Sequence, residues 1–154
     1  EKLTLTDELT GLANERALSQ QMSLQVTRRR HYRNPLTLVI LSLEVSDADD
    51  SHILDEDYNK IILTFSHFLR ERLRWADFIA RCQAGRFVIF LPETVSEEAT
   101  RLFDNIISEK DKLGLPAEQI DKLKLAYGLA EWEKGNDPRM LVERASQALK
   151  LALN

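Results

Sequence analysis

The chain has 154 residues, of which 44% are hydrophobic and 30% charged, so a single globular domain over residues 1–154 is expected rather than a disordered chain. The formal net charge of −4 at pH 7, with no basic block beyond Arg28–Arg30, argues against nucleic acid as the partner. The single cysteine, Cys82, excludes an internal disulfide, and the lack of a signal peptide or of an apolar run of about 20 residues predicts a cytoplasmic domain.

A turn and a helix are predicted at the start of the chain. Residues Asp7–Asn14 read DELTGLAN, in which Gly11 breaks the chain and Asn14 is placed to cap the helix that follows. From Asn14 to about Arg30 an apolar residue recurs every fourth position, which indicates one buried helix face: Leu18, Met22 and Val26. The basic residues that end this helix suit its dipole; contact with phosphate or a membrane is the alternative interpretation.

Leu36–Leu43 is a continuous apolar run that predicts a buried strand, and it ends at the polar segment Glu44–Asp47. The acidic run Asp47–Asp57 then predicts a solvated loop. A calcium-binding loop is the alternative, but the run lacks the glycine and the terminal glutamate of an EF-hand. Tyr58–Arg74 is the strongest predicted helix, because its apolar residues form one wide stripe: Ile61, Ile62, Phe65, Phe68, Leu69 and Leu73.

Two strands joined by a tight turn are predicted next. Asp77–Cys82 is short and rich in β-forming residues, and Phe87–Leu91 is a continuous apolar run that Pro92 ends. The turn between them contains Gly85, where a hairpin needs a positive φ. Because such a turn presents backbone and side chains at the rim of a rigid sheet, it is a favourable place for a site.

Ser96 is expected to cap the next helix, whose buried face has apolar residues at helical spacing: Ala99, Leu102, Phe103, Ile106 and Ile107. After a connection over Leu113–Asp121, apolar and other residues alternate from Lys122 to Leu129, which indicates a strand. Asp137 is expected to cap the last helix, with Pro138 at its first helical position. The resulting βαββαβ core predicts an α+β fold with a mainly antiparallel central sheet surrounded by helices.

Several of these segments together resemble the GGDEF domain, the bacterial diguanylate cyclase family with a nucleotide cyclase-like fold. DELTGLAN is similar to the family's opening DxLTGLxN, Arg74-Trp75-Ala76-Asp77 to its RxxD motif, and Arg81 with the strand VIFLP to the frame of its hairpin. The GGDEF signature itself is replaced by Gln83-Ala84-Gly85-Arg86-Phe87, in which only Phe87 matches. The resemblance covers nearly the whole chain. It implies an upstream sensor or other signalling domain, so we expect a fragment of a longer multidomain signalling protein. Membrane attachment of that parent protein is compatible with this expectation.

The resemblance also implies a degenerate active site, with no metal, no cofactor and no enzymatic activity. In the family, carboxylates at the third signature position and after the first strand hold Mg²⁺. Here Gly85 and Ser46 have no carboxylate, and Glu44 keeps one with a longer side chain. Arg86 places a cation where the family has an acid. Other family ligands for nucleotide are replaced by bulkier or unsuited residues: Gln83, Ala84, Asp49, His52 and Asn59. Residual GTP binding through Arg86, or an active cyclase with an unusual site, are the alternatives.

In the family, the RxxD motif is the site of product inhibition, so the resemblance predicts cyclic di-GMP binding at Arg74 and Asp77, with Arg101 as a weaker candidate. An arginine can fork onto phosphate or guanine, and a carboxylate can accept hydrogen bonds from guanine. Spacing of three at a helix end would place both groups at one surface. A purely structural role for the pair is the alternative, and Trp75 is either a stacking surface or buried.

The leading hypothesis is therefore a catalytically inactive GGDEF domain that acts as a cyclic di-GMP receptor. The alternative is a nucleotide-independent module for dimerisation or signal relay, which regulates an attached or partner domain. A homodimer is compatible with either hypothesis.

Overall fold

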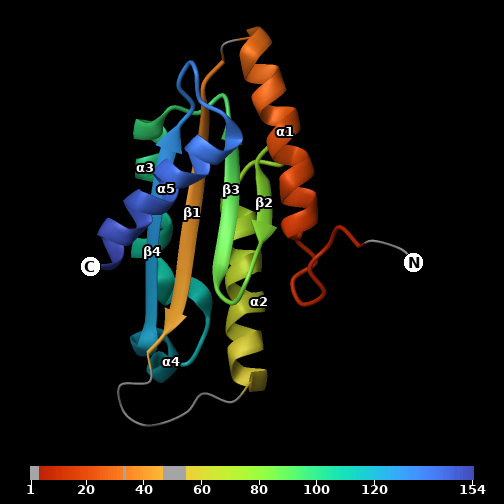
Figure 1. The fold of residues 1–154 in the computed structure, drawn as a ribbon. Helices are drawn as coiled ribbons and strands as arrows, with labels where there is room; N and C mark the ends of the chain where they lie inside the picture. The colour runs from red at the N-terminus through yellow and green to blue at the C-terminus, as the bar shows by residue number, and fades with distance from the viewer. Residues whose placement is uncertain (1–3, 33, 47–54) are drawn as a thin grey trace.

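A four-stranded antiparallel sheet with the strand order β2-β3-β1-β4 forms the centre of the computed structural model, which describes residues 4–32, 34–46 and 55–154. The elements follow in chain order: α1 (Glu15–Tyr32), β1 (Leu36–Val45), α2 (Asp55–Arg72), β2 (Phe78–Arg81), β3 (Arg86–Pro92), α3 (Ser96–Ser108), the 3₁₀ helix η1 (Lys110–Leu113), α4 (Ala117–Lys122), β4 (Leu123–Glu131) and α5 (Pro138–Leu153). This arrangement, drawn in Figure 1, confirms the predicted α+β class and the order of the main elements. The short helices η1 and α4 lie where only a connection was predicted.

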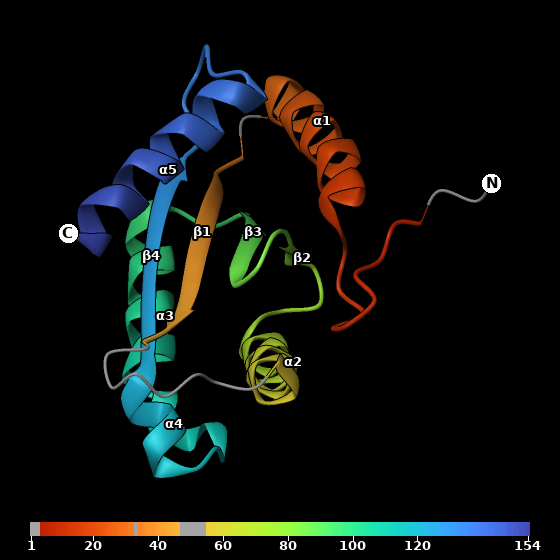
Figure 2. The ribbon, with the colours of Figure 1, turned by 60° about the horizontal axis from the view of Figure 1, so that its bottom comes forward.

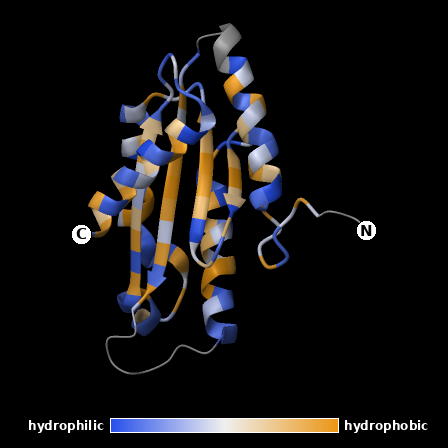
Figure 3. Ribbon diagram, in the orientation of Figure 1, coloured by the Kyte–Doolittle hydropathy of each residue, from blue (hydrophilic) through white to orange (hydrophobic). Residues whose placement is uncertain are grey.

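Helices cover both faces of the sheet, which explains why the central strand reads as a continuous apolar run. Figure 2 shows α1 and α5 on one side of the sheet and α2 and α3 on the other. Alternate residues of β1 divide between the two layers: Val39, Leu41 and Leu43 join the core beneath α2 and α3, whereas Leu36, Leu38 and Ile40 join the core beneath α1 and α5. Figure 3 shows the hydrophobic colour along most of β1 and β3, with hydrophilic colour at the end of each strand that lies near the hairpin turn.

Helix α5 packs closely on β4 because Gly128 leaves room for its backbone. A Cβ at Gly128 would lie 2.1 Å from the backbone nitrogen of Leu149, so no side chain fits between the two elements.

None of the helices in the described part of the chain is long and apolar enough to span a bilayer.

Two of the three predicted helix caps are confirmed. The Asn14 side chain accepts a hydrogen bond from the backbone N–H of Ala17 (3.0 Å), and Asp137 accepts one from Met140 (2.8 Å). The prediction for Ser96 is wrong, because α3 already begins at Ser96 and its backbone N–H donates to the Glu131 carboxylate (2.7 Å). Glu131 lies at the end of β4, so a residue distant in the sequence supplies the negative group at this helix N-terminus.

Candidate functional site

The turn between β2 and β3 carries the four residues Gln83–Arg86 at the rim of the sheet. The N–H of Arg86 donates to the carbonyl of Gln83 (3.0 Å), and the N–H of Cys82 donates to that of Arg86 (2.8 Å). The residue with positive φ is Ala84, at +50°, so the prediction that Gly85 takes this conformation is wrong. A left-handed alanine costs about 1 kcal/mol in backbone strain, which this turn retains.

Gly85 has a different structural role, because its backbone lies against β1. The Leu43 N–H donates to the Gly85 carbonyl (2.8 Å), and a Cβ at Gly85 would lie 2.0 Å from the Leu43 carbonyl oxygen. The position therefore admits glycine alone unless the backbone shifts. The other three turn residues, Gln83, Ala84 and Arg86, are exposed.

The turn lies beside the end of β1, so the structure brings Glu44 and Ser46 to the same edge of the sheet. Glu44 is exposed and faces Lys124 in the β1–β4 register, and the Ser46 N–H donates to the Lys122 carbonyl (2.8 Å). Asn59 is exposed on α2, whereas Asp49 and His52, with most of the acidic run from Asp47, lie outside the described residues.

The described side chains at this edge do not fit the Mg²⁺ site that the family resemblance implies. Glu44 offers one carboxylate, Ser46 a hydroxyl and Gly85 no side chain, whereas Mg²⁺ takes near-octahedral oxygen ligands and favours carboxylates. Within residues 4–32, 34–46 and 55–154, no group of three or more His, Cys, Asp or Glu side chains is placed to hold one metal ion.

An ion pair ties the N-terminal turn to the hairpin. Arg81 Nη1 lies 3.3 Å from both carboxylate oxygens of Asp7, and Arg81 Nε donates to the carbonyl of Ala84 (2.9 Å). The backbone N–H and the hydroxyl of Thr10 also donate to Asp7 (3.0 and 2.7 Å). Partial burial raises the pKa of Asp7, but the hydrogen bonds from Thr10 and the positive charge of Arg81 outweigh it, so that the pKa is lower than its ordinary value.

The Arg74–Asp77 motif lies at the opposite end of β3 and is closed on itself. Helix α2 ends at Arg72, and residues 74–77 form a turn in which Arg74 Nη2 lies 2.8 Å from the Asp77 carboxylate. The backbone N–H of Arg74 also donates to Asp77 (2.9 Å). Arg74 Nη2 further donates to the Pro92 carbonyl (2.7 Å) and the Thr94 hydroxyl (2.9 Å). The hydrogen bonds with Asp77 raise the pKa of the Arg74 guanidinium.

The expectation that both groups share one surface is wrong for Asp77. Its side chain is 1% exposed and that of Arg74 is 55% exposed, because Asp77 turns inward to accept hydrogen bonds from its own turn.

Arg101 is exposed on α3, one helical turn after Glu98. The negative charges of Glu93 and Glu98 act on Arg74 and contribute to its raised pKa, so the surroundings of Arg74 on this side are acidic. The hairpin turn Gln83–Arg86 and Arg74 lie at opposite ends of β3. This strand has seven residues and is therefore roughly 20 Å long.

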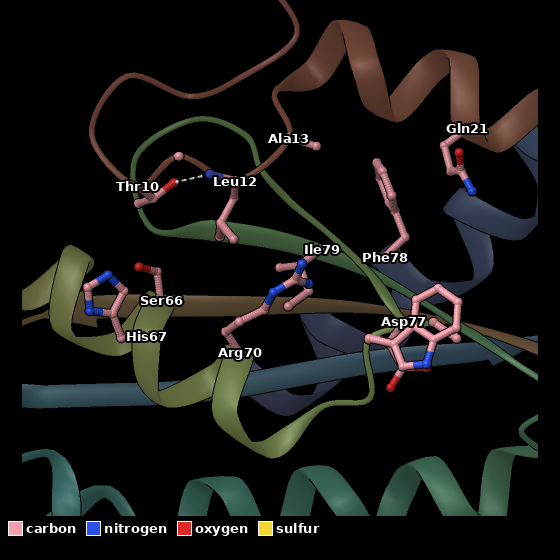
Figure 4. A pocket seen from close by; sticks show the side chains of 13 residues that line it. Thr10, Leu12, Ala13, Gln21, Ser66, His67, Arg70, Asp77, Phe78 and Ile79 are labelled. Carbon is pink, nitrogen blue, oxygen red and sulfur yellow. Dashed lines mark hydrogen bonds between the residues drawn. The ribbon is translucent and has the colours of Figure 1, made fainter.

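A cavity of about 530 Å³ lies on the other side of the 74–77 turn. It is lined by residues 10–13 of the N-terminal segment, Gln21 of α1, His67 and Arg70 of α2, and residues 75–79. Figure 4 shows Arg70 pointing from α2 into the space beneath the N-terminal segment. Trp75 belongs to this lining and is 93% exposed, so the structure excludes the burial that its sequence left open.

Neither this cavity nor the Asp7–Arg81 pair was predicted from the sequence. The cavity joins segments that are more than 50 residues apart, and no local periodicity signals such a meeting. Only a weak indication of the ion pair was present in the sequence. The motifs that contain Asp7 and Arg81 were both identified, but nothing in either motif indicated that the two side chains meet.

Comparison with known proteins identifies the fold and the family. The profile of the family described as "Diguanylate cyclase, GGDEF domain" matches residues 4–154. The chain is 33% identical over 152 residues to "Diguanylate cyclase DgcP" of Pseudomonas aeruginosa, covering 94% of this chain and 22% of DgcP. It is 26% identical over 152 residues to "Diguanylate cyclase DosC" of Escherichia coli K12, covering 95% of this chain and 32% of DosC. The chain thus spans less than two thirds of the curated relatives it matches.

The backbone is also similar to that of solved domains. The GGDEF domain of DgcB from Caulobacter crescentus, crystallised in complex with c-di-GMP, superposes with a TM-score of 0.85 at 18% identity. The superposition covers 99% of this chain and 92% of that domain. At this level of identity the likeness establishes the fold.

Proposed function

Because the chain belongs to the GGDEF domain family, we propose that it is a regulatory member that does not synthesise cyclic di-GMP and instead binds it through Arg74. The relatives DgcP and DosC are named diguanylate cyclases, so activity would be the default for a member with an intact signature. The observation that carries our proposal is Gly85 in the hairpin turn, which offers no carboxylate and cannot gain a side chain without moving β1 or the turn.

The loss of catalysis follows from the chemistry of phosphoryl transfer. Such a reaction requires the protein to position metal ions and to neutralise developing negative charge. Gly85 contributes no ligand, its contact with Leu43 excludes one, and Arg86 is a fixed cation at the exposed corner of the turn. Arg86 has the charge to hold a phosphate, so weak GTP binding without turnover is compatible with this proposal.

The proposal of cyclic di-GMP binding rests on Arg74. Its guanidinium is half-exposed and has the geometry for a forked contact with phosphate or with guanine. The DgcB domain, which has the same fold, was crystallised in complex with c-di-GMP. Because both Asp77 oxygens already accept hydrogen bonds from Arg74, binding through Asp77 requires the pair to open. We therefore infer that the closed pair is the ligand-free state, and that Arg101 adds charge at its margin.

The closed pair also favours a second candidate function. An Arg74–Asp77 turn that satisfies its own hydrogen bonds stabilises the fold without any ligand, as a nucleotide-independent relay or dimerisation module would need. In that case the Asp7–Arg81 pair is the element that couples an upstream signalling domain to the hairpin.

Calorimetric titration of cyclic di-GMP into the protein separates the two candidates. We expect binding by the wild type and at least a tenfold weaker affinity for Arg74→Ala, since a charge-assisted hydrogen bond contributes about 1.5–3 kcal/mol. Arg139→Ala is the matched control, because Arg139 is 87% exposed on α5 and, among the described residues, forms its ion pair along its own helix with Glu143. No heat of binding at high micromolar ligand would reject the receptor function and favour the relay module.

A further inference from the structure

The cavity beside the 74–77 turn has the properties of a small-molecule site. Its volume of about 530 Å³ lies within the range of roughly 300–1,000 Å³ that is typical of such sites. Its lining includes the apolar side chains of Leu12 and Ile79 and the polar side chains of Gln21 and Arg70. Figure 4 shows these side chains entering the space from different segments.

The charge in this cavity favours an anion. Arg70 is exposed, and within the described ranges no hydrogen bond or ion pair involves its guanidinium. The carboxylate that contributes to the lining is that of Asp77, whose charge is already paired with Arg74. The α3 side of the same turn differs, because Glu93 and Glu98 act there on Arg74. A phosphate on the cavity side therefore meets the Arg70 guanidinium in a lining whose carboxylate, that of Asp77, is already paired.

Trp75 adds an aromatic surface to the same cavity. The Trp75 indole is 93% exposed, so it contributes little of the stabilisation that a buried indole would give to the fold. Tryptophan is also one of the residues that most often contribute a large share of the binding energy in recognition sites. Purine bases stack on such surfaces with about 1–3 kcal/mol per base. A cation and a free indole in one cavity are a combination that suits a phosphorylated purine.

We propose that Trp75 and Arg70 form the specificity half of the nucleotide site, with the indole stacked on one guanine of cyclic di-GMP and the guanidinium paired with a phosphate. This inference rests on the proposed function, and it places the ligand across the 74–77 turn. Arg74 then contacts the ligand from one side of the turn, and the cavity receives a base from the other. Asp77, which is part of both the turn and the cavity wall, links the two halves.

Cyclic di-GMP titration of four variants tests this assignment. We expect Trp75→Ala to weaken binding by tenfold or more and Trp75→Phe to retain affinity within a few fold, because phenylalanine keeps a stacking face. Arg70→Ala should weaken binding by several fold to tenfold, and Arg139→Ala should have no effect. In a Trp132→Phe background the emission comes from Trp75, and the ligand should quench it. Thermal melts serve as the folding control, since both side chains are exposed.

The outcomes separate this inference from the proposed function. If the wild type binds and Arg74→Ala does not, while Trp75→Ala and Arg70→Ala bind like the wild type and the ligand leaves Trp75 emission unquenched in the Trp132→Phe background, the cavity is excluded and the receptor function stands. If the wild type itself does not bind cyclic di-GMP, both the receptor function and the cavity's role in it are overturned. Weakened binding by Trp75→Ala and Arg70→Ala with unchanged melting supports the two-sided site.

Discussion

The guanidinium of Arg81 lies 3.3 Å from the carboxylate of Asp7, a residue 74 positions earlier in the chain. Both side chains are mostly buried, with 13% and 18% of their surface exposed. Arg81 also donates to the carbonyl of Ala84, so one guanidinium joins the N-terminal turn to the hairpin turn between β2 and β3. A displacement of the N-terminal segment would therefore act directly on the hairpin.

Removal of either charge should destabilise the domain. Asp7→Asn leaves Arg81 partly buried without its counter-charge, and we expect a loss of about 2 kcal/mol in the free energy of unfolding, less than for a fully buried pair. Urea denaturation measures this loss. The double variant Asp7→Asn/Arg81→Gln should lose less than the sum of the two single variants. Strict additivity would contradict a direct interaction.

The same pair predicts a pH dependence of stability. The pKa of Asp7 in the folded protein is below its ordinary value of 3.8, so the unfolded chain takes up a proton first as the pH falls. The stabilisation from Asp7 is therefore complete above about pH 5 and is lost as the pH falls through 4 and below. We expect the stability difference between the wild type and Asp7→Asn to shrink over that range in denaturant titrations. A difference that stays constant down to pH 3 would contradict the lowered pKa.

The strained backbone at Ala84 predicts a stabilising substitution. Ala84→Gly should raise the free energy of unfolding by about 0.5–1 kcal/mol, because glycine adopts a φ of +50° without the steric cost to Cβ. The matched control is Ala17→Gly within α1, where the same change should cost about 1 kcal/mol. Opposite shifts in melting temperature for the two variants are expected. A destabilised Ala84→Gly variant would show that the turn conformation differs from the one described.

Acidic substitutions in the hairpin turn test the stability of the fold and the catalytic activity independently. Arg86→Glu changes an exposed side chain and should fold like the wild type, whereas Gly85→Asp places a Cβ 2.0 Å from the Leu43 carbonyl and should cost about 1–3 kcal/mol. Incubation with GTP and Mg²⁺ or Mn²⁺, followed by chromatography, should detect no cyclic di-GMP from the wild type or Arg86→Glu. Product above a no-protein control from either protein would overturn the proposed loss of activity.

Features that depend on neighbours in the sequence were predictable from it. Helix periodicity, the alternation in β4 and the caps at Asn14 and Asp137 are local, because each involves residues within a few positions of one another. The continuous apolar run of β1 also indicated a strand covered on both faces, since an exposed face would require polar residues at alternate positions. The GGDEF motifs gave the family from the same short segments.

Long-range contacts decided the rest, and they decided most of the candidate site. The cap of α3 comes from Glu131 at the end of β4, and the requirement for glycine at position 85 comes from the approach of Leu43. The RxxD spacing could not reveal that Asp77 turns inward, because its burial depends on how the turn packs against the sheet. Trp75 is exposed for the complementary reason, that none of the segments the structure describes covers it. Sequence thus determined which elements form, and only the packing of those elements determined which side chains remain free to bind.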